Sequence, residues 1–123
     1  EEKQLYHAAA CIASNFIVSL TACARDLLGN CGFDAQQAMR LLSPIHRATS
    51  ANIVKLGPEE ALTGPIVRGD AGSVAIHLSA LENQSPEMAE LYRCLAKETL
   101  KLAQQSGRLA ADKAKRISLL LEK

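Results

Sequence analysis

Aromatic residues are scarce in this chain, and neither sign of charge is in clear excess. Its 123 residues include two Tyr, two Phe and no Trp, and 14 Lys and Arg stand against 13 Asp and Glu, for a formal net charge of +1. A balanced charge produces no field that attracts nucleic acid or an anionic membrane surface. We therefore expect neither as a partner.

The chain also lacks the cysteine spacing of a disulfide scaffold. Small secreted domains use dense, short spacings of cysteine. The four cysteines here contain no C-x-x-C pair and lie in apolar or helical contexts: Cys11, Cys23, Cys31 and Cys94. We interpret them as reduced, buried thiols in a cytoplasmic protein.

Motifs for nucleotide and metal binding are absent as well. The sequence contains neither G-x-G-x-x-G nor G-K-[ST], so it encodes no complete nucleotide site. It contains no H-E-x-x-H, and His7 with Cys11 is a weak metal pair without further ligands, so we predict no metal site. His46 and His77 are interpreted as structural histidines.

Residues 4–24 carry no charged side chain, which raises the question of a membrane span. Six polar residues in this stretch argue against a span: Gln4, His7, Ser14, Asn15, Ser19 and Thr21. A signal peptide has a basic start, whereas this chain opens with Glu1-Glu2-Lys3. We expect no membrane span, and a chain that is one segment of a longer protein.

Good helix formers dominate the remaining sequence. Ala and Leu are abundant and 48% of the chain is apolar, which favours helices around a real core. Asp34, Asp70 and Ser85 are expected N-caps, and Pro and Gly mark further helix ends. These signals predict helices at 5–29, 35–42, 70–83, 86–105 and 109–122 and a short turn at 59–61. At Pro44 the second helix kinks, or a fresh helix starts, and continues to 56. We predict an all-α fold for 1–123: a single bundle of about five to six helices around a long apolar first helix, with one ordered loop at 62–70.

A narrow polar stripe follows the expected first helix. At about 100° per residue, several polar side chains fall on or beside one line of this helix: His7, Cys11, Ser14, Asn15, Ser19, Thr21 and Arg25. The stripe either bonds to a neighbouring loop or faces solvent. Alternatively, it lines a cleft in which His7 exchanges protons and Asn15 orients a substrate oxygen.

The segment from Leu62 to Asp70, L-T-G-P-I-V-R-G-D, interrupts the helical pattern. Its two glycines allow close backbone approach, Thr63 offers a hydroxyl, and Arg68 offers a forked cationic donor before a helix N-terminus. These features suit a site for a carboxylate or phosphate. They suit equally well a connector whose backbone is satisfied by Thr63 and by Asp70 as N-cap, and residue patterns leave both interpretations open.

Three stretches together resemble a known family: Leu5-Tyr6-His7-Ala8-Ala9-Ala10, Ala13-Ser14-Asn15-Phe16 and the run from Ala61 to Asp70. They are similar to the helical C-terminal domain, named domain of unknown function 2520, of bacterial proteins whose N-terminal domain is Rossmann-like and binds NAD(P). The resemblance continues through Leu91-Tyr92-Arg93, and L-T-G-P-I-x-R-G-D is its most specific part. It implies an oxidoreductase whose NAD(P) is bound mainly by a Rossmann domain absent from this chain.

More distantly, the layout resembles the C-terminal domains of pyrroline-5-carboxylate reductase, ketopantoate reductase and the β-hydroxyacid dehydrogenases. In those relatives this domain forms much of the dimer interface and closes over the nicotinamide. The resemblance implies a homodimer through the first helix, and a small-molecule substrate beside Thr63, Gly64 and Pro65. One departure stands out: ketopantoate reductases and β-hydroxyacid dehydrogenases carry a Lys four residues before an Asn, whereas here Cys11 takes that place before Asn15.

We therefore expect the substrate-binding and dimerisation domain of an NAD(P)-dependent oxidoreductase that acts on a small anionic keto or imine compound, with no complete enzyme in this chain alone. The predicted catalytic residues are His7 and Asn15. The predicted substrate-binding residues are Thr63, Gly64, Pro65 and Arg68. The alternative is a non-catalytic helical module that binds a protein through its apolar first helix.

Overall fold

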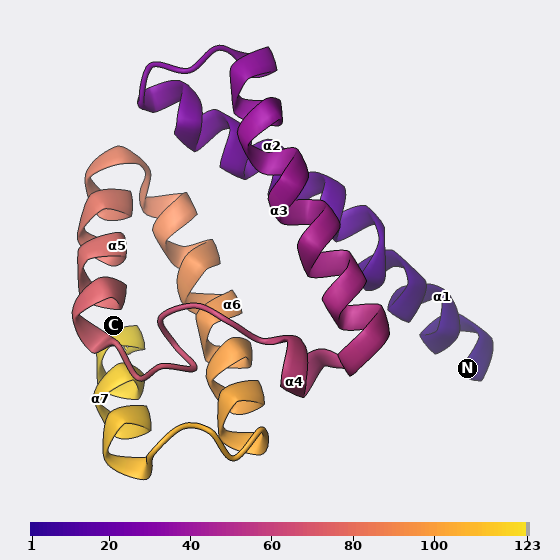
Figure 1. Cartoon of the computed structure of the whole chain (residues 1–123), viewed down its shortest axis with the longest axis vertical. Helices are drawn as coiled ribbons and strands as arrows, with labels where there is room; N and C mark the ends of the chain where they lie inside the picture. Colours follow the sequence, from indigo (N-terminus) through magenta and orange to yellow (C-terminus); the bar gives the residue numbers. More distant parts are fainter. Residues whose placement is uncertain (123) are drawn as a thin grey trace. The chain divides into compact units, whose positions relative to one another are not determined.

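A computed structural model describes residues 1–122. Helices make up 81% of the structure, no strand occurs among the described residues, and the helices number six when α1 and α2 are joined. The helices in chain order are α1 (Glu2–Ala13), α2 (Asn15–Asn30), α3 (Ala35–Leu56), α4 (Pro58–Ala61), α5 (Ala71–Gln84), α6 (Pro86–Gln105) and α7 (Ala111–Leu121), as Figure 1 shows. The predicted all-α fold and its helix count are confirmed.

The chain divides into two compact units, which are described separately: residues 1–48 and residues 49–123. In the first unit, the expected unbroken helix from Leu5 to Gly29 is interrupted at Ser14, whose backbone has φ −124° and ψ −67°. The Ser14 N–H still donates to the Ala10 carbonyl at 3.0 Å, so the break is local. Ser and Asn hydrogen-bond readily to nearby backbone and favour helix ends, which explains a break at the Ser14-Asn15 pair.

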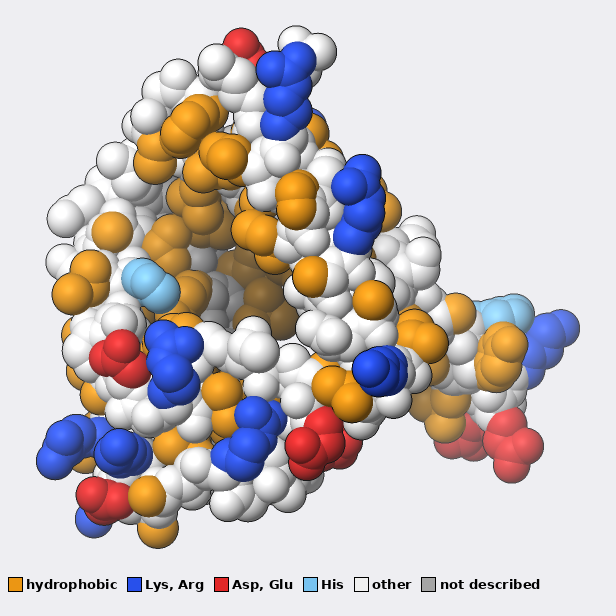
Figure 2. Space-filling view, in the orientation of Figure 1, with side chains coloured by type: hydrophobic (Ala, Val, Ile, Leu, Met, Phe, Trp, Pro, Cys, Tyr) orange, Lys and Arg blue, Asp and Glu red, His pale blue; other side chains and the backbone are white. Residues whose placement is uncertain are grey.

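No residue of α1 or α2 is buried. Large apolar side chains on both helices are exposed, among them Leu5 at 66% and Val18 at 71%. In Figure 2 hydrophobic side chains lie uncovered at the surface over α2 and α3. Taken together as Glu2–Asn30, α1 and α2 are long and apolar enough to cross a membrane by length and composition, a criterion that core helices of soluble proteins and signal sequences also meet.

The helix α3 begins with a reciprocal cap. The Gln37 N–H donates to Asp34 Oδ1 at 2.8 Å, and the Asp34 N–H donates to Gln37 Oε1 at 2.9 Å. This arrangement satisfies two backbone donors at the helix start and confirms Asp34 as the N-cap. The helix then continues past Pro44 to Leu56, so the fresh start considered at Pro44 does not occur. Because proline lacks an N–H, only one backbone bond is lost there.

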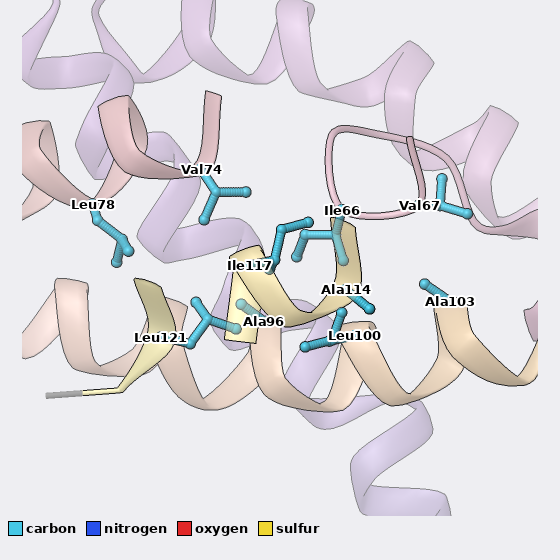
Figure 3. Close-up of a cluster of buried hydrophobic side chains, with 10 residues drawn as sticks. All are labelled: Ile66, Val67, Val74, Leu78, Ala96, Leu100, Ala103, Ala114, Ile117 and Leu121. Atoms are coloured by element: carbon cyan, nitrogen blue, oxygen red, sulfur yellow. The ribbon is translucent and has the colours of Figure 1, made fainter. Parts of the chain in front are cut away.

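The described buried cluster lies entirely in the second unit. Its members come from the 62–70 segment, α5, α6 and α7, as Figure 3 shows: Ile66, Val67, Val74, Leu78, Ala96, Leu100, Ala103, Ala114, Ile117 and Leu121. The helices α5, α6 and α7 contact one another, and Ile117 is fully buried. The first helix, around which the sequence predicts the bundle to form, contributes no residue to this cluster. That other elements cover this helix stays a prediction.

Capping residues fix where α5 and α6 begin. Asp70 accepts from the Ser73 N–H at 3.0 Å, and Ser85 Oγ accepts from the Met88 N–H at 3.2 Å, as the sequence predicts. An ion pair with one buried partner also joins the two helices. Arg93 on α6 is 7% exposed and pairs with Glu82 on α5, a hydrogen bond that raises the pKa of Arg93 above its usual value.

The prediction of buried cysteines is wrong, although all four are free. Cys31 and Cys94 are exposed, and Cys11 and Cys23 are half-buried. Cys31 directly follows the end of α2. Cys94 lies on the outer side of α6, 3.6 Å from Glu90 Oε1. Apolar sequence neighbours do not bury a cysteine when it lies on the outward side of a helix.

Candidate functional site

The 62–70 segment is an ordered turn, as the sequence predicts. The Asp70 N–H donates to the Pro65 carbonyl at 2.8 Å, and the Gly69 N–H donates to the Ile66 carbonyl at 3.0 Å. Gly64 and Gly69 have φ of +95° and +71°, in the region where only glycine is free of strain. The turn therefore depends on both glycines.

Neighbouring elements hold this turn from two sides. Ile66 and Val67 point into the buried cluster and are 6% and 7% exposed. Arg108, after α6, donates from Nη2 to the Leu62 carbonyl at 3.1 Å. The segment is thus part of the core and not a loose connector.

Asp70 closes the segment and starts α5. Ser73 donates twice to its carboxylate, from Oγ to Oδ2 at 2.6 Å and from the backbone N–H to Oδ1 at 3.0 Å. These hydrogen bonds, with a smaller contribution from the charge of Arg68, lower the pKa of Asp70 below its usual value. The structure confirms the Asp70 cap on which the connector interpretation rests.

A pocket of about 290 Å³ lies beside the same segment. Three elements of the second unit contribute its lining residues: Thr63, Pro65, Ile66, His77, Tyr92, Leu95, Ala96 and Thr99. This volume is at the lower end of the range for small-molecule sites, which is about 300 to 1,000 Å³. The pocket thus suits a small metabolite.

A phenol and an imidazole meet in the wall of the pocket. His77 Nδ1 lies 3.0 Å from Tyr92 Oη, and the two rings pack edge to face, with centroids 5.9 Å apart and planes at 82°. Burial raises the pKa of Tyr92. The phenol therefore keeps its hydrogen at neutral pH and is available as a donor.

The structure brings together some of the predicted site residues. Thr63 and Pro65 line the pocket, with Gly64 between them in the turn. Arg68 is exposed and does not line the pocket. The predicted catalytic residues lie in the first unit, where His7 and Asn15 are both exposed, and their roles stay predictions.

Sequence reasoning missed the pocket's other wall. His77 was interpreted as a structural histidine, yet it pairs with Tyr92 in the lining. A signal was present on α6, because Tyr92, Leu95, Ala96 and Thr99 recur at helical spacing and share one face of the helix. Their partner on α5 depends on helix packing, which periodicity does not specify.

The polar stripe of the first helix bonds to another helix at Thr21. Thr21 Oγ1 lies 3.0 Å from His46 Nε2 on α3, and it also donates to the Ile17 carbonyl at 2.7 Å. Arg25 pairs with its neighbour Asp26 at 3.1 Å. This end of the stripe therefore bonds to other protein groups, but the partner of Thr21 is on the helix α3 and not on the neighbouring loop of the first interpretation.

The residues of the pocket do not fit a dinucleotide. The pocket is too small for two nucleotides, and Gly64 and Gly69 belong to a turn between helices, whereas a dinucleotide fingerprint follows a strand. Residues 1–122 contain no group of three or more His, Cys, Asp or Glu side chains that could hold a metal ion. The pocket is a candidate site for a small organic molecule.

Comparison with known proteins gives one match. The family model described as Domain of unknown function (DUF2520) matches residues 1–99, a range that includes every lining residue of the pocket. No curated protein and no solved structure matches the chain. The more distant similarity to pyrroline-5-carboxylate reductase and ketopantoate reductase thus stays a prediction.

Proposed function

The chain belongs to the DUF2520 family, and from this premise we propose that it is the substrate-binding and dimerisation domain of an NAD(P)-dependent oxidoreductase that acts on a small anionic keto or imine compound. The observation that carries the proposal is the pocket. In it, Thr63 and Pro65 of the 62–70 segment lie with the His77–Tyr92 pair around a volume suited to a small metabolite.

The lining supports recognition of a carbonyl or imine. Among residues 1–122 no group hydrogen-bonds to the Thr63 hydroxyl, so it is free to bond to a ligand. Pro65 and Ile66 offer an apolar wall next to it. In this scheme Arg68, exposed at the end of the same turn, attracts the anionic group of the substrate.

The proposal assigns cofactor binding to an N-terminal Rossmann domain. NAD(P), when bound there, supplies hydride chemistry that no side chain of this chain provides. His7 and Asn15 remain the proposed proton donor and orienting residue of the first helix. Neither has the lysine partner of the distant relatives, since Cys11 occupies that position.

Dimerisation is proposed through the first helix. Seven of its large apolar side chains are exposed: Leu5, Tyr6, Ile12, Phe16, Ile17, Val18 and Leu20. Exposed apolar surface of this kind marks interaction sites. Sedimentation of the chain should show a dimer, which Ile12→Glu, a charge placed at a 62% exposed position of the apolar face, converts to a monomer. A wild-type chain that stays monomeric at high concentration would contradict this assignment.

The test of the function uses the gene itself. The reading frame upstream of the Glu1 codon should encode a strand followed by G-x-G-x-x-G within about 120 to 150 residues, the size and signature of a Rossmann unit. The joined protein should oxidise NAD(P)H with at least one member of a panel of keto acids and cyclic imines. Thr63→Ala and Arg68→Ala should lower kcat/KM at least tenfold.

Matched control variants separate the effect of losing a site residue from the effect of losing the same side-chain type elsewhere. Thr49→Ala and Arg116→Ala remove the same side-chain types from exposed positions that do not line the pocket, and they should leave kcat/KM unchanged. Activity that is insensitive to Thr63→Ala and Arg68→Ala would overturn the site. Absence of a dinucleotide-binding domain upstream would overturn the oxidoreductase.

The exposure of the first helix favours one other candidate function, a non-catalytic interaction module. An apolar helix with no buried residue also suits the binding of another protein. The upstream reading frame discriminates, because an initiator Met directly before Glu1 favours the module.

A further inference from the structure

The lining of the pocket is mostly apolar. Pro65, Ile66, Leu95 and Ala96 supply the apolar surface, and the polar groups are hydroxyls and the ring of His77. Among residues 1–122, no Lys, Arg, Asp or Glu lines it. Burying a charge without a partner costs far more than burying a neutral oxygen that is hydrogen-bonded. The pocket therefore favours an apolar chain that carries one neutral oxygen.

Hydrogen-bond accounting leaves two hydroxyls of the lining to donate to that oxygen, the exposed Thr63 and the half-buried Tyr92, and the half-buried one is better shielded from competing water. The Thr99 hydroxyl already donates to the Leu95 carbonyl at 2.8 Å, so its hydrogen is used. Tyr92 Oη lies 3.0 Å from His77 Nδ1. When the imidazole carries its hydrogen on Nδ1, it donates to the phenol oxygen, and the phenolic hydrogen is free to point at a ligand.

We propose that the pocket binds the apolar chain and the keto oxygen of an α-keto acid, that Tyr92 donates its phenolic hydrogen to this oxygen while accepting one from His77 Nδ1, and that the carboxylate stays outside the pocket. The proposal rests on the proposed function for its ligand class. It goes further by assigning the oxygen-binding donor to α6 and the imidazole that orients this donor to α5.

Three ligands of nearly equal shape test this assignment. α-Ketoisocaproate has all three features, isocaproate lacks the keto oxygen, and methyl isobutyl ketone lacks the carboxylate. Each is titrated into the isotope-labelled chain, and its Kd is taken from the shifts of backbone amides in 62–70, α5 and α6. The wild-type chain should bind both keto compounds more tightly than isocaproate.

Tyr92→Phe removes only the donor. It should weaken binding of both keto compounds about fivefold, the worth of one neutral hydrogen bond, and leave isocaproate unchanged. Tyr6→Phe is the matched control, because Tyr6 is 74% exposed and contacts the ring of His7 in the first unit. It should change none of the three constants.

His77 is tested as a positioning residue. His77→Ala should reduce the preference for α-ketoisocaproate over isocaproate, and His77→Asn should restore it, because the amide of Asn donates from a place close to Nδ1. Equal weakening of all three ligands by Tyr92→Phe would overturn the proposal, as would failure of the wild-type chain to bind either keto compound. If Tyr92→Phe left the Kd of methyl isobutyl ketone unchanged, the placement of the carboxylate outside the pocket would be overturned.

These measurements are independent of the oxidoreductase test. They need neither cofactor nor a second domain, since they follow binding by the chain itself. Selective keto binding that depends on Tyr92, together with an inactive joined protein, would reject the redox function and keep the pocket assignment. If the joined protein were active and Tyr92→Phe changed neither its KM nor its kcat, the pocket assignment would be rejected and the redox function kept.

Discussion

Replacing three glycines one at a time by alanine tests whether the 62–70 turn is held by its packing. Gly72 lies in the first turn of α5, and a Cβ there would be 3.6 Å from Asp70 Oδ1, an ordinary contact. Gly64 has φ +95° but open space around it. Gly69 has φ +71°, and its Cβ would lie 2.8 Å from Lys113 Cβ on α7.

The expected losses follow from these three environments. Gly72→Ala should be neutral or stabilise by up to about 1 kcal/mol, because alanine favours a helix. Gly64→Ala should cost about 1 to 2 kcal/mol, the strain of an L-residue at positive φ. Gly69→Ala adds overpacking of about 1 to 3 kcal/mol to the same strain, for a total near 3 kcal/mol.

Urea unfolding followed by circular dichroism measures these differences, and thermal unfolding should show a drop of roughly 12 °C for Gly69→Ala. Lys113→Ala should recover part of the Gly69→Ala loss, because it removes the Cδ that would lie 2.5 Å from the new Cβ, but not all of it. A Gly69→Ala variant no less stable than Gly64→Ala would refute close packing of the turn against α7.

Two further predictions concern the core and the cap. Ile117→Ala should lower the free energy of unfolding in urea by about 3 kcal/mol, because the side chain is fully buried. Leu119→Ala, at an exposed position, should lower it by less than about 1 kcal/mol. Equal losses would contradict the packing of α7. The pKa of Asp70 is lowered by its Ser73 hydrogen bonds, so the stability it contributes is present above its unfolded-state pKa and is lost as the pH falls through that value toward the folded pKa. The midpoint temperature of thermal unfolding should therefore fall more steeply on acidification in the wild type than in Asp70→Asn. Identical dependence of this temperature on pH in the two proteins would contradict the cap.

Local rules predicted the helix ends well. Asp34, Asp70 and Ser85 are caps in the structure because their side chains satisfy backbone donors within three residues, an interaction that the sequence specifies directly. The break at Ser14 was missed because the apolar periodicity continues across it. Pattern and propensity disagreed there, and propensity determined the backbone.

The candidate site was only half predictable. Thr63 and Pro65 were found because their segment breaks the helical pattern and matches a family motif. His77 and Tyr92 are 15 residues apart on different helices, and their meeting depends on how α5 packs on α6. That register is fixed by tertiary contacts such as the Arg93–Glu82 pair, which periodicity does not reveal.

The most direct test of the central claim is a measurement of intermolecular nuclear Overhauser effects between α-ketoisocaproate and the labelled chain. The account predicts effects from the ligand methyl groups to Ile66 and Leu95, and from its methylene group to the Tyr92 ring, as expected if the apolar end is bound within the pocket. Effects confined to the first helix, or none to the pocket residues at saturating ligand, would contradict the assignment of this pocket as the substrate site.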